Sequence, residues 1–130
     1  MGKIYENTEQ FESLFTQMFD EIADDDGMTK LVEQQMVIRF RLSDPDVDLW
    51  IDGRARPVTA SFRALGVEPT LVAGLSTDSM HELLLGTLPL SRALMFRKLK
   101  VQGSKSKAIK LEPVLHAMQR VYPDLAADLR

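Results

Sequence analysis

The spacing of apolar residues changes at Met36, and this change constrains the fold more than any other feature of the sequence. Before it, apolar residues between Phe11 and Ile22 recur every three or four positions, the period of a helix with one buried face. After it, apolar and polar residues alternate in four segments, which predicts strands over residues 36–43, 47–52, 58–64 and 71–75. A chain with this order places helices against one face of a sheet.

Further helices and one more strand are expected after the fourth strand. Ser76 or Thr77 is predicted to cap a helix that ends at Gly86, because glycine readily adopts the left-handed conformation found after helices. A short helix over residues 91–96 and a strand around residues 99–101 follow. The last helix begins near Pro113, a residue suited to a first helical turn.

The length of 130 residues suits one domain with one apolar core. Within it we expect N-terminal helices over residues 1–35, four strands over 36–75, helices and a fifth strand over 76–103, and a C-terminal helix over 104–130. Because the helices are grouped before and after the strands, the predicted class is α+β, with a five-stranded, mostly antiparallel sheet covered by helices on one face.

The sequence offers little for catalysis, metal binding or cofactor chemistry. It has no cysteine, which excludes disulfides and thiolate metal sites. The run from Asp44 to Asp48 resembles the start of a calcium loop but lacks the glycine and glutamate of that motif, and His81 and His116 stand apart from any zinc or nucleophile motif. We therefore expect no enzyme activity, cofactor or metal. Without an apolar leader or membrane-spanning segment, a cytoplasmic location is expected.

Charge is unevenly distributed along the chain. Residues 53–130 carry 12 basic and 6 acidic side chains, and no carboxylate lies between Glu82 and Glu112. The basic residues there either form an ordinary solvated face or bind an anionic membrane surface or an acidic partner protein. Nucleic acid is disfavoured by an isoelectric point near 5.4. The docking candidates are Arg97, Lys98, Lys100, Lys105 and Lys107.

A leucine-rich helix that ends at Gly86 is followed by a signature of Ala93 with Leu94, Lys98, Val101 and Gly103. With these residues, the sequence from about Met36 to Tyr122 resembles the sterol carrier protein 2 family of lipid-binding domains, although Ser104 stands where the family often has aspartate. The resemblance implies a five-stranded sheet, helices against one face, and an apolar tunnel between them that takes a lipid tail. The departure at Ser104 affects a capping contact more than the fold.

Several apolar residues on the predicted buried faces are candidates to line such a tunnel, and each of them also fits an ordinary core. Trp50 lies on the opposite face of its strand from Leu49 and Ile51, either at a rim of the site or over the outer sheet face. The lining candidates are Ile38, Phe40, Leu49, Phe62, Leu71, Leu83, Leu84, Met95, Phe96, Leu115 and Met118.

The function expected from the resemblance is non-catalytic binding and intracellular transfer of a hydrophobic lipid, such as a fatty acid, phospholipid, isoprenoid or sterol-like molecule. One alternative is an accessory or scaffold domain that presents a lipid-like intermediate to biosynthetic enzymes. A small enzyme that uses the apolar pocket as its active site is a third possibility, and a polar cluster buried inside that cavity would favour it. The sequence does not predict the oligomeric state.

Overall fold

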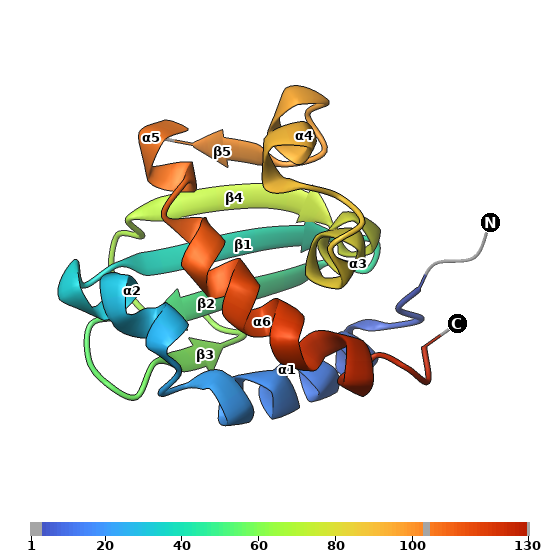
Figure 1. The fold of residues 1–130 in the computed structure, drawn as a ribbon. Helices are drawn as coiled ribbons and strands as arrows, with labels where there is room; N and C mark the ends of the chain where they lie inside the picture. Colours follow the sequence, from blue (N-terminus) through green and yellow to red (C-terminus); the bar gives the residue numbers. More distant parts are fainter. Residues whose placement is uncertain (1–3, 103–104, 130) are drawn as a thin grey trace.

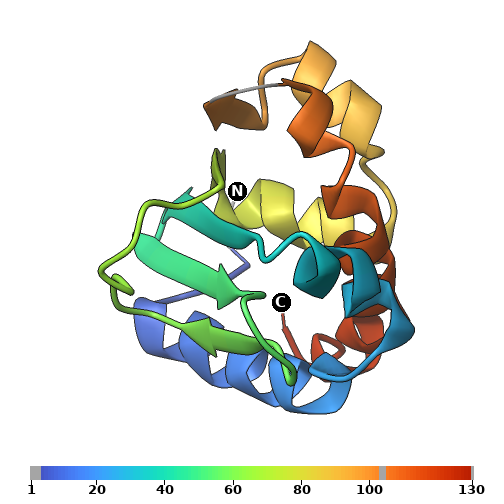
Figure 2. The same ribbon diagram turned by 90° about the vertical axis from the view of Figure 1, so that its left-hand side faces the viewer.

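The computed structural model describes residues 4–102 and 105–129, and it shows a five-stranded sheet with helices packed on one face (Figures 1 and 2). In chain order the elements are α1 (Thr8–Ile22), η1 (Asp26–Met28), α2 (Thr29–Glu33), β1 (Val37–Ser43), β2 (Val47–Asp52), β3 (Thr59–Ser61), β4 (Leu71–Ser76), α3 (Thr77–Leu85), α4 (Leu90–Met95), β5 (Lys100–Gln102), α5 (Lys105–Ala108) and α6 (Leu111–Leu125). Figure 2 shows the strands on one side and α2 and α6 on the other. This confirms the predicted α+β class.

The sheet has the strand order β3-β2-β1-β4-β5. β1, β2 and β3 form an antiparallel meander, and β4 and β5 are also antiparallel. β4, however, pairs in parallel with β1, from Ile38 opposite Leu71 to Ser43 opposite Ser76. The sheet is therefore mostly antiparallel, as predicted, with one parallel pair at its centre.

Local capping contacts define the ends of α1 and α3. The Asn7 side chain accepts a hydrogen bond from the backbone N–H of Gln10 at 2.8 Å, which satisfies an otherwise unpaired donor in the first turn of α1. Ser76 does the same for Ser79 at the start of α3, at 3.0 Å. Gly86 follows α3 with φ of 83°, the left-handed conformation that its position in the sequence predicts.

The third strand is shorter than predicted. β3 covers only Thr59–Ser61 of the expected residues 58–64, because the chain pairs with β2 only from Trp50 to Asp52 and then leaves the sheet edge. Phe62 therefore lies just outside the strand.

Gly53 follows β2 where the backbone passes close to α2. A Cβ at this position would lie 2.8 Å from the carbonyl oxygen of Met36 and 2.7 Å from Cγ of Leu31, so a side chain has no room there. The chain then runs through a loop to β3.

The core lies between the sheet and the helices. Phe11 and Phe15 on α1 stack with ring centroids 3.9 Å apart, and both are fully buried. α6 crosses the helical face of the sheet diagonally, while α1 lies below β3 (Figure 1). None of the helices among residues 4–102 and 105–129 has both the length and the apolarity needed to cross a membrane.

Candidate functional site

Eight of the eleven predicted lining residues come together in one apolar cluster between the sheet and the helices. They extend from β1, β2, β4, α3 and α6, and none is more than 5% exposed. These residues are Ile38, Phe40, Leu49, Leu71, Leu83, Leu84, Leu115 and Met118. The alternating strand positions and the helix spacing therefore identify one shared interior. A tunnel through that interior remains a prediction.

The other three candidates lie elsewhere. Met95 and Phe96, at the end of α4, are 73% and 60% exposed, so they lie at the surface and not in the interior where we expected them. Ala93 is the buried residue of this six-residue helix, and Leu94 packs partly against the core. Phe62 is half-buried in a shallow hollow beside α1. Apolar spacing could not show which side of so short a helix has a neighbour to pack against.

The structure also brings together three polar side chains that the sequence analysis did not connect. The hydroxyl groups of Tyr5 and Tyr122 lie 2.6 Å apart, and the Tyr122 hydroxyl lies 2.7 Å from Nδ1 of His81. Both tyrosines are fully buried, and His81 is half-buried. One signal of this cluster was present in the sequence. Tyr122 lies on the apolar face of the last helix, and a buried phenol needs a hydrogen-bond partner. Its partners, 41 and 117 residues away, could not be located from local pattern.

Burial keeps this chain of groups neutral. It raises the pKa of Tyr122 to about 12, raises that of Tyr5 above its ordinary value, and lowers that of His81. One arrangement then satisfies all three groups: Tyr5 donates to Tyr122, and Tyr122 donates to Nδ1 of His81. The reverse direction would leave the buried Tyr5 proton without an acceptor. The contact joins the segment before α1 to α3 and α6.

Trp50 lies on the outer face of the sheet, away from the helices, in register with Arg39 of β1. The Arg39 guanidinium lies 5.2 Å from the centroid of the indole, and Trp50 is only 4% exposed. Arg39 also donates two hydrogen bonds to the Asp48 carboxylate, at 2.8 and 3.1 Å. Partial burial of the Asp48 carboxylate acts to raise its pKa, but these hydrogen bonds outweigh that effect and keep the pKa below its ordinary value. Of the two positions considered for Trp50, the outer face is the one observed.

A hollow of about 650 Å³ lies on the same outer face, and Arg39 and Asp48 are among the residues that line it. Gly74 lies between Arg41 on β1 and Lys100 on β5, in one cross-strand row. The absence of a side chain at Gly74 leaves space between these two cations. Most of the residues that line this hollow are charged or polar, and the sheet separates it from the apolar interior, so we do not assign it the predicted tail-binding role.

The predicted docking residues lie around the end of α4 and the start of β5. Arg97, Lys98 and Lys100 are exposed, and Lys98 Nζ lies 3.9 Å from a carboxylate oxygen of Glu82. The backbones of Lys105 and Lys107 belong to α5, but their side chains, like the signature residues Gly103 and Ser104, are outside the described part of the chain. The structure therefore gathers three of the five docking candidates on one projecting segment.

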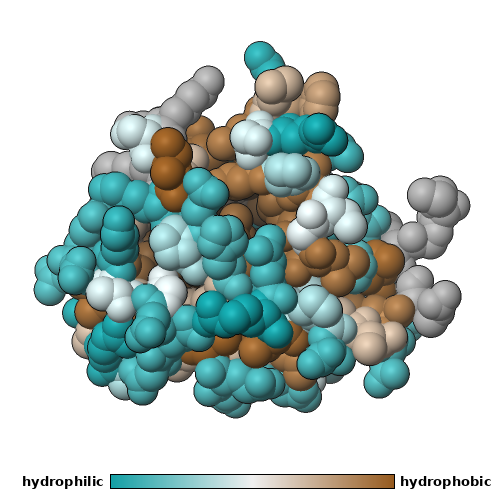
Figure 3. Space-filling view, in the orientation of Figure 1, coloured by the Kyte–Doolittle hydropathy of each residue, from teal (hydrophilic) through white to brown (hydrophobic). Residues whose placement is uncertain are grey.

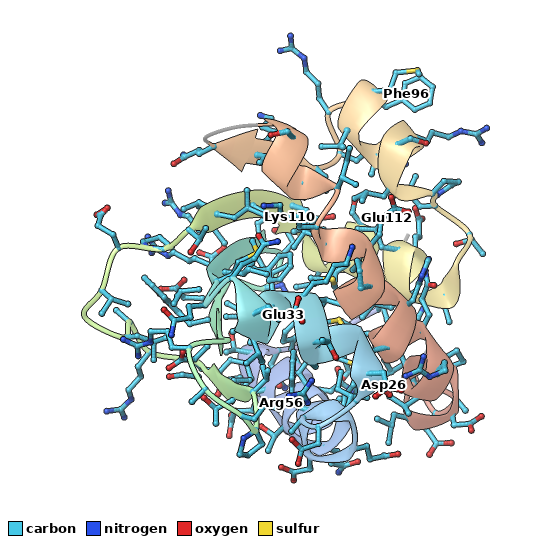
Figure 4. All side chains as sticks on the ribbon, turned by 60° about the vertical axis from the view of Figure 1, so that its left-hand side comes forward. Asp26, Glu33, Arg56, Phe96, Lys110 and Glu112 are labelled. Atoms are coloured by element: carbon cyan, nitrogen blue, oxygen red, sulfur yellow. The ribbon has the colours of Figure 1, made fainter. Side chains whose placement is uncertain are left out.

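A small apolar hollow of about 260 Å³ lies behind this segment. In the space-filling view, apolar atoms form the floor of a depression between the α4 region and the start of α6 (Figure 3). Figure 4 shows Lys110 and Glu112 at the start of α6 and Phe96 at the outer end of α4. The residues lining the small hollow are Leu94, Arg97, Leu99, Lys100 and Val101.

Comparison with solved structures shows the same fold in sterol carrier proteins. Sterol Carrier Protein 2 from Yarrowia lipolytica, in its apo form, has a TM-score of 0.65 and 18% sequence identity, with 85% of this chain and 90% of that chain covered. The sterol carrier protein domain 2 of Helicoverpa armigera has the same TM-score and identity, with 85% and 87% covered.

A curated relative and a family model extend the comparison to sequence. Over 85 residues, 65% of this chain, the sequence is 31% identical to Hydroxysteroid dehydrogenase-like protein 2 of Bos taurus, of whose length the match spans 20%. The model of the SCP-2 sterol transfer family matches residues 12–116. This match confirms the resemblance noted in the sequence, and the chain belongs to the SCP-2 sterol transfer family.

Proposed function

We propose that this protein binds the apolar tail of a lipid between the sheet and α3 and α6, and carries that lipid in the cytoplasm without catalysing a reaction. The observation that carries the proposal is the gathering of eight predicted lining residues into one apolar cluster under the family's fold. Family membership supports lipid binding and transfer in general. The ligand classes that we propose are fatty acids, phospholipids, isoprenoids and sterol-like molecules. The comparisons do not favour the alternative of a scaffold that presents an intermediate to biosynthetic enzymes.

The energetics favour an apolar tail as the ligand. Each methylene moved from water into an apolar interior gains about 0.8 kcal/mol. A sixteen-carbon tail therefore gains on the order of 10 kcal/mol before the costs of ordering it and of moving side chains aside. Few polar contacts are needed to hold such a tail. Met80 and Met118, two of the methionines of this interior, have flexible side chains that adapt to tails of different shape.

We further propose that α6 moves aside for uptake at its N-terminal half. Near its C-terminal end, the Gln119 side chain donates to the Leu83 carbonyl at 2.8 Å, Arg120 pairs with Asp25, and Tyr122 joins the buried tyrosine–histidine chain. Near its start, the described residues form one such hydrogen bond, the exposed one from Lys110, the residue before α6, to Gln34. The start of the helix is therefore easier to displace than its end.

A lipid titration tests this proposal. Delipidated protein titrated with a fluorescent fatty acid is expected to show saturable binding near one ligand per chain. Leu84→Phe, at a fully buried interior position, should weaken binding at least about tenfold, because added volume in a packed interior competes with the tail. The matched control is Leu85→Phe on the same helix, where the native side chain is 41% exposed.

Two results would contradict the proposal. One is the absence of saturable binding across fatty acids, phospholipids, isoprenoids and sterols. The other is equal binding by both variants, provided that circular dichroism shows both to be folded. Mass spectrometry of lipid extracted from the purified protein identifies the ligand class.

A further inference from the structure

The end of α4 exposes two large apolar side chains next to each other. Met95 is 73% exposed and Phe96 is 60% exposed, and each could bury far more of its apolar surface. Figure 1 shows α4 projecting from the body of the protein, and Figure 4 places Phe96 at its outer end. Isolated exposed apolar residues are common, but a projecting pair of this size marks a contact surface.

Cations without acidic partners surround this pair. The side chains of Arg92, Arg97 and Lys100 are exposed and form no ion pair or hydrogen bond with the described residues. The sequence from residue 83 to residue 111 contains no carboxylate that could neutralise them. The apolar pair therefore lies within a positively charged segment.

The backbone gives the tip a defined shape. Arg97 has φ of 58°, so the chain turns out of the helix directly after Phe96. The backbone N–H groups of Lys98 and Leu99 both donate to the Ala93 carbonyl, at 2.9 and 3.0 Å, and this closes the end of α4. Buried Ala93 and Leu99 attach the tip to the body. Met95 and Phe96 are consequently presented by an ordered turn.

We propose that this tip docks the protein on an anionic lipid bilayer, with Met95 and Phe96 inserted at the level of the acyl boundary. Arg92, Arg97 and Lys100 then lie at the depth of the headgroup phosphates. Apolar side chains flanked by cations match such a bilayer surface, because the apolar groups meet the acyl chains and the cations meet the anionic headgroups. An acidic protein would pair with the cations but gain nothing from the two apolar side chains, and a second copy meeting tip to tip would bring like charges together.

This inference rests on the proposed function, because it explains how a tail reaches the interior. The apolar hollow of about 260 Å³ lies directly behind the tip, and Arg97 and Lys100 line it together with Leu94 and Val101. Leu94 and Val101 in turn pack against the core. A docked tip therefore places the bilayer at the outer end of an apolar route that leads toward the helical face of the sheet.

Sedimentation with lipid vesicles tests the docking surface. The full chain is expected to bind vesicles of phosphatidylcholine mixed with phosphatidylglycerol, and to bind pure phosphatidylcholine vesicles much more weakly. The double change Met95→Ser and Phe96→Ser should lower the partition coefficient at least about tenfold, since most of the apolar insertion is lost. Arg97→Gln should lower it about fivefold, and raised salt should lower it further. The matched control, Leu85→Ser, removes an exposed apolar residue on α3 and should leave binding unchanged.

The outcomes separate this inference from the proposed function. If the chain takes up fluorescent fatty acid in solution but does not bind anionic vesicles, or binds them equally well after the double serine change, the docking inference is overturned. Concentration-dependent dimers that the double change abolishes would also overturn it, in favour of a second copy. If the chain binds vesicles as described but takes up no lipid, the docking stands and the carrier function fails.

Discussion

Replacing Tyr122 with phenylalanine should destabilise the protein through the loss of one buried hydroxyl group. The phenyl ring keeps its edge-on contacts with Phe15, at 6.0 Å between centroids, and with His81, at 5.6 Å. Both hydrogen bonds of the hydroxyl group disappear, to Tyr5 and to His81. The Tyr5 hydroxyl group is then left fully buried without a partner, whereas half-buried His81 can turn to water.

The size of the effect follows from these different surroundings. An unsatisfied buried hydroxyl costs about 1–3 kcal/mol, and the lost bond to His81 about 1 kcal/mol, so Tyr122→Phe should lower the free energy of unfolding by about 2–4 kcal/mol. In a Tyr5→Phe background no phenol is left unpaired, and the same change should cost only about 1 kcal/mol. The coupling energy between the two sites should therefore be about 1–3 kcal/mol.

Urea unfolding at neutral pH, followed by far-UV circular dichroism, measures both quantities. The free energy of unfolding of a domain of this size falls by about 2 kcal/mol per molar urea. Tyr122→Phe should therefore lower the urea midpoint by about 1–2 M in the wild-type background, and by about half a molar in the Tyr5→Phe background. Equal shifts in the two backgrounds would refute the reasoning, because they would show that the Tyr5 hydroxyl does not depend on Tyr122.

Two further predictions concern His81 and Gly53. Burial holds the His81 pKa below its ordinary value of 6.5, so the native state binds fewer protons than the unfolded chain, and the free energy of unfolding should fall as pH drops from 6.5 toward the native pKa. His81→Gln should reduce this dependence of the free energy of unfolding on pH, which urea unfolding between pH 7 and pH 5 measures. A pH dependence equal to that of the wild type would contradict the assignment to His81. Gly53→Ala should cost about 1–3 kcal/mol, because the new Cβ would lie 2.8 Å from the Met36 carbonyl oxygen. Gly74→Ala, where the nearest atom would be 3.8 Å away, is the control and should unfold like the wild type, so equal midpoints for both variants would show that Gly53 is not constrained.

The features that the sequence predicted correctly are those determined by neighbouring residues. The cap at Ser76 depends on a backbone donor three residues away, and the left-handed turn at Gly86 depends on one residue. The alternation along β1 likewise identifies Ile38, Phe40 and Leu42 as core residues from spacing alone, although Val37, on the opposite face, is buried as well.

The features that were missed depend on parts of the chain that are distant in sequence. The parallel pairing of β4 with β1 joins Ile38 to Leu71 across 33 residues, and no local pattern specifies that partner. The exposure of Met95 and Phe96 depends on whether another element covers α4, which their hydrophobicity does not reveal. Apolar spacing thus identifies residues that favour burial, while the tertiary arrangement decides which of them remain at the surface.

The attachment of α6 connects the buried tyrosine–histidine chain to the proposed uptake of lipid. Near its start, α6 touches η1 closely: a Cβ at Gly27 would lie 2.7 Å from the Pro113 carbonyl oxygen and 3.0 Å from Cβ of Ala117. Moving the start of α6 would expose its buried side chains Leu111, Val114 and Leu115, but would break no buried side-chain hydrogen bond among the described residues. The contacts of Tyr122 are directional and buried, and breaking them would leave the Tyr5 hydroxyl unpaired. We therefore expect α6 to open at its beginning during uptake, while its end stays fixed to α3 and to the segment before α1.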